Sequence, residues 1–274
     1  LNYYDRALTL ASRWNWLAAK ADVLHILGRR DEESATLELL AQQPEAPPFE
    51  VHFRWGEYFE SMGQYPRAEE AVQRALDAAR QLADLRGQVR SLARLGLMAW
   101  RQGDYEAASQ HYQQALDVLT DQAGYESEEA DVRYGMGLLF RQQGEYTMAG
   151  RQLSAALALH QQTGNRQEEA RTLMAQGGVD FLRRSYDDAL SAYRQALTTR
   201  RTVGDRSGES ASLLSLGQAS RSLGDHAEAE KLLHSALEIQ QAIHDRWLES
   251  LVWNELGVVY MLVGRYASAE EALN

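Results

Sequence analysis

Apolar side chains recur along this chain at the spacing of one face of an α-helix, in blocks separated by short polar turns. The block from Leu92 to Leu116 shows the arrangement, with apolar positions at helical spacing on both sides of Gly103 and Asp104. Glycine suits the left-handed residue that ends a helix, and aspartate suits the N-cap of the next one. The pattern therefore predicts two amphipathic helices joined by a tight turn.

This two-helix pattern returns along most of the chain. Second helices are expected to follow the turns at Gly63, Gly103, Gly144, Arg184, Gly224 and Gly264, at intervals of 40 or 41 residues. A fixed period of this size is typical of stacked supersecondary units rather than of one globular core. The sequence predicts an all-α fold, a right-handed α-solenoid of helix-turn-helix repeats that forms one array over 1–274.

Small residues occupy the same places in each repeat. Six first helices carry a glycine that is followed after twelve residues by an alanine: Gly56, Gly96, Gly137, Gly177, Gly217 and Gly257. In the first five repeats a second alanine follows after seven more residues, and the sixth match is truncated. This arrangement resembles the tetratricopeptide repeat family, in an extended variety, since its usual period is 34 residues. It is similar to the arrays of kinesin light chains, cell-polarity adaptors and bacterial signal-transducing ATPases with repeat sensors.

The N-terminal part departs from the regular repeat. Residues 1–43 read as degenerate repeats, with a second helix expected over 1–13 and with Ala21 in place of the packing glycine. Residues 44–49 hold three of the four prolines and predict a bend, not a domain boundary. Regular 40-residue repeats follow over 50–274. The chain starts without methionine and stops within an expected helix, so we expect both ends to be cut from a longer array.

Composition and motifs argue against catalysis. There are no cysteines, which excludes disulfides and thiolate chemistry, and neither a phosphate-binding loop nor an H-E-x-x-H motif occurs. We expect no enzyme activity, no cofactor and no metal site. A net charge of −11 argues against a nucleic-acid partner. No apolar run could cross a membrane and no signal segment is present, which predicts a soluble, cytoplasmic protein.

Family resemblance implies that certain first-helix positions line a concave groove. In the middle repeats these positions carry five arginines interleaved with aromatic residues: Arg90, Trp100, Arg101, Tyr134, Arg141, Arg171, Gly178, Phe181 and Arg221. Arginine binds carboxylates through a two-pronged fork and stacks on aromatic rings. Around Gly56 the same positions are acidic instead, with Glu50, Glu57 and Glu60.

Two structural alternatives stay open at this point. The groove arginines either bind a ligand or pair with acids on neighbouring second helices. Gly178 follows the packing residue Gly177 and has no packing reason of its own, although glycine inside a helix costs about 1 kcal/mol against alanine. Its absent side chain either makes room for a ligand or reflects drift at a tolerant position.

The groove pattern leads to two functional hypotheses. The first is a non-enzymatic interaction module that binds an extended acidic and apolar peptide or protein segment. The second is the sensor of a bacterial signal-transducing ATPase or transcription regulator, which binds a small polar effector. Because Arg265–Asn274 leaves an apolar face uncovered, we also expect end-to-end self-association through the terminal helices.

Overall fold

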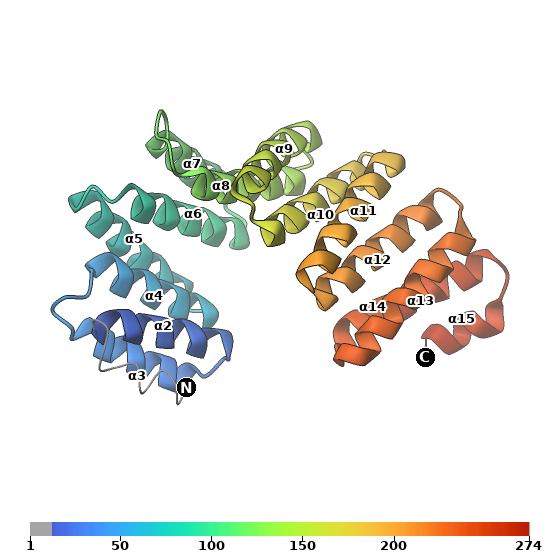
Figure 1. Cartoon of the computed structure of the whole chain (residues 1–274), viewed down its shortest axis with the longest axis horizontal. Coiled ribbons are helices and arrows are strands. Elements are labelled where there is room, and N and C mark those ends of the chain that lie inside the picture. The colour runs from blue at the N-terminus through green and yellow to red at the C-terminus, as the bar shows by residue number, and fades with distance from the viewer. Residues whose placement is uncertain (1–12, 274) are drawn as a thin grey trace. The chain divides into compact units, whose positions relative to one another are not determined.

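The computed structural model describes residues 13–273 and consists of helices in sequential antiparallel pairs (Figure 1). The expected helix over 1–13 lies almost entirely outside the described residues. The fourteen helices of the described part are α2 (Arg13–Ile26), α3 (Arg30–Ala41), α4 (Pro48–Ser61), α5 (Tyr65–Gln81), α6 (Leu85–Arg101), α7 (Tyr105–Val118), α8 (Glu126–Gln142), α9 (Tyr146–Thr163), α10 (Arg166–Leu182), α11 (Tyr186–Val203), α12 (Arg206–Ser222), α13 (His226–Ile243), α14 (Arg246–Leu262) and α15 (Tyr266–Leu273). The all-α repeat architecture expected from the sequence is therefore confirmed.

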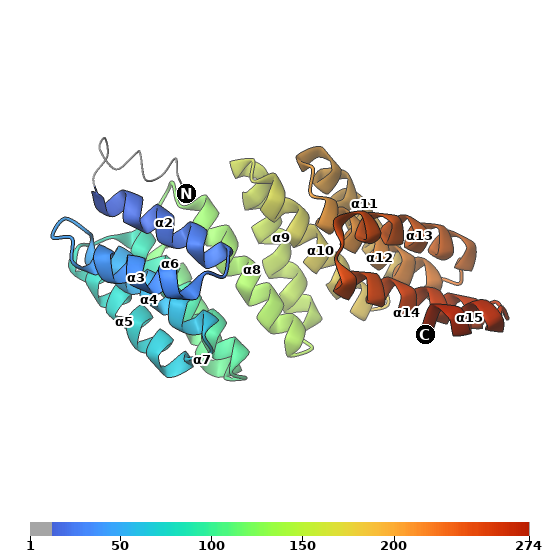
Figure 2. The same cartoon turned by 90° about the horizontal axis from the view of Figure 1, so that it is seen from below.

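The chain divides into two compact units, residues 1–128 and residues 129–274. In unit 1 the first helices of the pairs are α2, α4 and α6, and the second helices are α3, α5 and α7. In unit 2 the first helices are α8, from residue 129 on, and α10, α12 and α14. Helices α12 to α15 follow one another side by side in both views (Figures 1 and 2). We call the surface formed by the first helices of a unit its first-helix face.

Glycines hold the two helices of each pair close together. A Cβ added to Gly137 would lie 2.6 Å from Cγ of Leu153, and one added to Gly177 would lie 2.6 Å from Cε1 of Tyr193. No real Cβ tolerates such distances without a shift of its neighbours. All six expected packing glycines meet a second-helix side chain in this way, which confirms their role.

The expected small residues of the second helices lie in the core. Ala68, Ala108, Ala149, Ala189 and Ala229 are fully buried, as are the alanines seven positions after each of them. Leucine and tyrosine side chains fill the spaces that these small residues leave, for example Leu153 in α9 and Tyr193 in α11. Because each pair packs on its neighbours in sequence, the core extends along the array, and in unit 2 one buried cluster runs from Ala189 in α11 to Ala272 in α15.

Turns and caps also follow the sequence. Gly103 is left-handed at φ +83°, and the Asp104 carboxylate accepts a hydrogen bond from the Ala107 amide at 2.9 Å. Asn165 and Asp225 accept in the same way from the amides three residues on. Within the Pro-rich stretch, Pro48 already forms the first residue of α4, where its missing N–H costs nothing. The Pro-rich stretch 44–49 therefore includes the connection between α3 and α4 and the first residues of α4.

Candidate functional site

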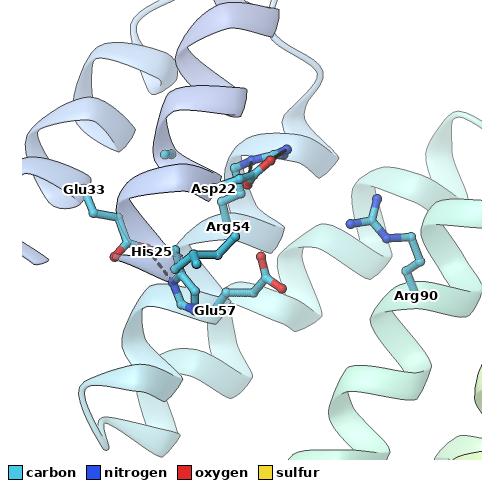
Figure 3. Close-up of a pocket in the computed structure, with 8 residues that line it drawn as sticks. Asp22, His25, Glu33, Arg54, Glu57 and Arg90 are labelled. Atoms are coloured by element: carbon cyan, nitrogen blue, oxygen red, sulfur yellow. Dashed lines mark hydrogen bonds and ion pairs between the residues drawn. The ribbon is translucent and has the colours of Figure 1, made fainter. Parts of the chain in front are cut away.

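The first-helix face of unit 1 contains a hollow of about 270 Å³ between α2, α4 and α6. Acidic and basic side chains both line it: Asp22, His25, Glu33, Arg54, Glu57 and Arg90. Figure 3 shows Arg90 reaching toward this group from α6, with His25 and Glu33 joined by a hydrogen bond. Of the expected groove residues, Arg90 is thus brought to a cavity.

Acids of α4 hold the arginines of α6 in unit 1. Arg94 lies 2.8 Å from one oxygen of Glu60 and 3.2 Å from Glu57, and Arg101 pairs with the other oxygen of Glu60. The Arg94–Glu60 contact is electrostatic, since Nε and Oε2 do not meet in hydrogen-bond geometry. Glu60 is buried, with 4% of its side chain exposed, so it receives two guanidinium groups in a sheltered place.

Arg90 is held more loosely and packs on aromatic rings. Its guanidinium lies 4.5 Å from the ring centre of Phe53 and 5.3 Å from that of Phe49, within the range of cation–π attraction. The nearest carboxylate, that of Glu50, is 4.0 Å away. Trp100 is partly buried on the same helix. Arg90, Arg94 and Arg101 of α6 therefore face acids of the preceding first helix, α4, and the alternative of second-helix acids does not describe these pairs.

Burial also changes the pKa of one of the α4 acids, Glu57. It raises the pKa of the Glu57 carboxyl, and the charges of Arg94, His25 and Arg90 offset this only in part. Glu57 is therefore protonated more readily in the folded chain than in water. Keeping the Glu57 carboxylate ionised in this buried place costs free energy, and the neighbouring arginines reduce that cost.

Unit 2 places its expected groove residues on three successive first helices, α8, α10 and α12. Arg171 in α10 donates from Nε to the Tyr134 hydroxyl in α8 at 3.2 Å, with its guanidinium 4.5 Å from the Tyr134 ring centre. The same guanidinium pairs with Glu168 of its own helix at 3.1 Å. Phe181 packs edge-on against Tyr186, at 5.3 Å between ring centres.

Arg221 in α12 is tied to the next first helix. Its Nε lies 3.3 Å from the Glu255 carboxylate in α14, and Gln218 donates to the other oxygen at 2.9 Å. The Glu255 side chain is 15% exposed, so this contact is sheltered. As in unit 1, the acid that holds the arginine lies on a neighbouring first helix.

Arg141 differs from the other groove arginines. Among the described residues, no carboxylate lies within ion-pair distance of its guanidinium, although the side chain is partly buried. A Cβ added to Gly178 would lie 3.5 Å from Nη1 of Arg141 and 4.0 Å from the Tyr193 hydroxyl, in ordinary contact distance. The structure therefore brings Arg141, Gly178 and Tyr193 together, and a methyl group at position 178 would fit beside them without a clash.

Burial raises the pKa of Tyr193 to about 12, with the charge of Arg141 acting in the opposite direction. The hydroxyl thus keeps its proton at neutral pH and can donate a hydrogen bond. Arg141 and Tyr193 together offer donors to an anionic or carbonyl oxygen placed over Gly178. This combination is a binding geometry and contains no nucleophile with an activating base.

Sequence reasoning did not include the position two residues before each packing glycine. In three repeats the residue at this position is charged and forms an ion pair with a neighbouring first helix: Arg54, Arg94 and Glu255. The signal available in the sequence was the recurrence of charge at one repeat position, since these residues precede Gly56, Gly96 and Gly257 by the same interval. Tyr193 was likewise missed, because it belongs to a second helix.

These observations define the class of protein: an array of paired helices stacked through small residues, with arginine and aromatic side chains on its first helices. The tetratricopeptide repeat model matches residues 49–121, 128–202 and 209–274. The chain belongs to the tetratricopeptide repeat family. Its members are typically modules that bind proteins or peptides and are usually non-catalytic. No helix of the described residues is long and apolar enough to cross a bilayer.

Solved structures with the same fold include sensors and motor-associated repeats. The quorum sensor NprR from B. thuringiensis, in its apo form, matches with a TM-score of 0.78 and 14% identity over 99% of this chain and 78% of that one. A signal transduction ATPase with a tetratricopeptide repeat sensor, PH0952 from Pyrococcus horikoshii, matches with a TM-score of 0.78 and 12% identity, over 98% of this chain and 42% of that one. Nearly identical repeats of a kinesin light chain from Podosopora anserina match with a TM-score of 0.59 and 17% identity. This match covers 68% of this chain and 92% of that one. No curated protein matches the sequence. At these identities the likeness concerns the fold.

Proposed function

We propose that the first-helix face of unit 2 binds an extended peptide or protein segment that carries carboxylates between apolar side chains. The observation that carries the proposal is Arg141, a partly buried guanidinium without a carboxylate partner among the described residues. A guanidinium has five N–H donors and loses hydration when it is buried, so a ligand carboxylate is its natural partner.

Space and neighbouring donors support the same assignment. Gly178 has no side chain to fill the place beside Arg141, and the Tyr193 hydroxyl borders this place. A helix-interior glycine costs about 1 kcal/mol against alanine, and here alanine would meet only ordinary contacts. We infer that Gly178 leaves room for ligand atoms, in preference to drift at a tolerant position.

The remaining groove residues of unit 2 extend the surface along the array. Tyr134 and Phe181 offer apolar ring surface on either side of Arg141 in sequence, and Arg171 is 56% exposed. Arg221 lies two repeats beyond Arg141 in sequence and is held by Glu255, which orients it. Charge-assisted contacts to such arginines contribute about 1.5–3 kcal/mol when they are sheltered and much less when exposed.

Arg90, Trp100 and Arg101 of unit 1 also remain predicted ligand contacts, but their surroundings differ from those in unit 2. Their face already contains acids, since Arg101 pairs with Glu60 and Arg90 lies near Glu50. A ligand carboxylate must compete with these partners there. We therefore assign the main acidic-peptide contact to unit 2 and keep the unit 1 residues as an extension of the surface.

The proposal is tested with defined peptides. Fluorescence anisotropy would measure binding of labelled ten-residue peptides in which Glu alternates with Leu or Phe, beside matched peptides with Gln in place of Glu. We expect the acidic series to contain binders whose affinity falls at least about tenfold on the change to Gln, because one sheltered charged contact is worth about that much. Equal affinity of both series, or no binding of either, would contradict the proposal.

A small-effector sensor is the second candidate function. It is favoured by the likeness of nearly the whole chain to the ATPase with a repeat sensor and to the quorum sensor NprR. A sensor of this kind needs a compact ligand with one anionic group, for which Arg141 and Tyr193 suffice. Titration with short dicarboxylates and single acidic amino acids would separate the candidates: binding as tight as that of the best peptide favours the sensor, and binding at least about tenfold weaker favours the peptide module.

A further inference from the structure

His160 is a buried histidine without a hydrogen-bond partner among the described residues. It lies in the last turn of α9, is fully buried, and neither of its ring nitrogens is paired. Unpaired polar atoms in a protein interior are rare and need an explanation, such as an ion or a water molecule. The sequence predicted no metal site, and His160 is not among the residues expected to line a site.

Two carboxylates from neighbouring first helices meet this imidazole. Asp131 in α8 and Glu168 in α10 each place an oxygen near His160, and the three potential ligand atoms all lie within 4.8 Å of one another. Asp131 is exposed and Glu168 is half-buried, so the cluster is open to solvent on one side. All three residues belong to unit 2.

The turn between α9 and α10 fixes this arrangement. Gly164 is left-handed at φ +70°, and the Asn165 amide donates to the backbone oxygen of His160 at 3.0 Å. The Asn165 side chain in turn accepts from the Glu168 amide at 3.3 Å. Both His160 and Glu168 are thus anchored through the backbone of one tight turn.

We propose that Asp131, His160 and Glu168 form a binding site for a transition-series divalent cation such as Zn²⁺. Imidazole nitrogen and carboxylate oxygen are established ligands of zinc at about 2.0–2.2 Å, and three protein ligands leave a position for water or another ligand. Ligand atoms around a tetrahedral ion of this kind lie about 3.4 Å from each other, so side-chain rotation must bring the most distant atoms of the cluster more than about 1 Å closer.

The charge of the cluster agrees with this assignment. Glu168 pairs with Arg171 at 3.1 Å through Oε2, so the ion would use the other oxygen or displace the guanidinium. Asp131 and Glu168 bring two carboxylates toward one divalent cation, and carboxylate oxygens are among its established ligands.

The equivalent corners of the next two repeats lack the cluster. Forty residues on, Arg200 stands in the place of His160 and donates to the backbone oxygen of Gly208 and toward Ser212. Eighty residues on, Gln240 is buried and unpaired like His160, but Leu248 stands in the place of Glu168. Only the α8–α9–α10 corner of these three combines an imidazole with carboxylates, so the site is not a general feature of the repeat.

Isothermal titration calorimetry of the chelator-treated protein with Zn²⁺, Mn²⁺ and Mg²⁺ tests the proposal. We expect one Zn²⁺ per chain, weaker binding of Mg²⁺, and a loss of Zn²⁺ affinity of at least about tenfold in Asp131→Asn, His160→Gln and Glu168→Gln. His234→Gln is the matched control, because it removes a histidine of the same unit outside the cluster, and it should bind like the parent.

Asp131→Asn keeps the test decisive if His160→Gln folds poorly, because Asp131 is exposed and the change preserves its shape. Circular dichroism melts of each variant check folding, and Zn²⁺ should raise the melting temperature of the parent but not of Asp131→Asn. Absence of Zn²⁺ binding to the parent would overturn the proposal and leave a buried water as the partner of His160. Binding that survives both carboxylate changes, or binding lost equally in His234→Gln, would overturn it too.

Discussion

The first-helix faces of the two units share one backbone plan and differ in how their arginines are balanced. In unit 1, Arg94 and Arg101 of α6 converge on Glu60 of α4. In unit 2, Arg221 meets Glu255, but Arg141 meets no carboxylate among the described residues and lies beside Gly178. Equal packing can thus support arginines that share a buried acid in one unit and an arginine without such a partner in the other.

The difference shows that stacking decides which charges meet. Arg101 and Glu60 are 41 residues apart, and Arg221 and Glu255 are 34 apart, close to one repeat in both cases. Since first helices of neighbouring repeats lie next to each other, one acid introduced into a repeat neutralises an arginine of the adjoining repeat. Binding capacity can therefore change between repeats without any change in the core.

The largest effect is expected for Glu60→Gln in unit 1. The change keeps the shape of a buried side chain but leaves Arg94 and Arg101 without their acid, and breaking a buried ion pair costs about 3–5 kcal/mol. Because both arginines are partly exposed, we expect a loss of about 2 kcal/mol in the free energy of unfolding. Urea unfolding measures it, and Glu255→Gln in unit 2, which releases one arginine, should cost less. Equal stability of Glu60→Gln and the parent would remove the claim that unit 1 is closed by its ion pairs.

Two adjacent glycines of unit 2 are expected to respond to alanine with effects of opposite sign. Gly177→Ala places a Cβ 2.6 Å from the Tyr193 ring, so we expect a loss of roughly 1–3 kcal/mol through overpacking. Gly178→Ala meets only ordinary contacts and should stabilise the chain by up to about 1 kcal/mol through helix propensity. Thermal or urea unfolding of the two variants compares them directly. Destabilisation by both would mean that Gly178 is a packing residue and that the space beside Arg141 has a structural reason.

The smallest effect concerns the pH dependence of unit 1. Burial raises the pKa of Glu57 above its ordinary value of 4.5, so the folded chain binds this proton more tightly than the unfolded chain. The contribution of Glu57 to the free energy of unfolding is therefore fully present below pH 4.5, where the side chain is protonated. It is lost as the pH rises through the pKa of Glu57 in the folded chain. Relative to the parent, Glu57→Gln should gain stability between pH 4 and pH 7. A stability difference that stays constant over this range, in urea unfolding at several pH values, would show that burial does not penalise this carboxylate.

Much of the fold could be predicted from the sequence because packing repeats with the chain. Gly137 and Ala149 recur every 40 or 41 residues, and each recurrence fixes a close contact between two helices. Caps such as Asp104 and Asn165 are local, since the side chain serves an amide three residues on. Periodic and local features of this kind need no knowledge of the stacked structure.

The site could be predicted only in part. Groove positions implied by the family resemblance included Arg141 and Gly178, which the structure brings together, but gave no information on which arginines have acidic partners. The partner of Arg94 depends on how α4 and α6 stack, and its position was outside the expected set. The cluster around His160 could not be predicted either. Its carboxylates, Asp131 and Glu168, lie on two other helices, so no spacing within one helix indicates that they are close to His160.

The central claim is that the unpaired guanidinium of unit 2, and not the paired one of unit 1, binds the acidic ligand. Arg141→Gln and Arg101→Gln compare the two, with the tightest acidic peptide from the anisotropy series as probe and a melting curve for each variant. We expect Arg141→Gln to weaken binding by at least about tenfold with the melting temperature nearly unchanged, and Arg101→Gln to lower the melting temperature with binding changed less than about threefold. Intact binding with lost stability in Arg141→Gln would contradict the account.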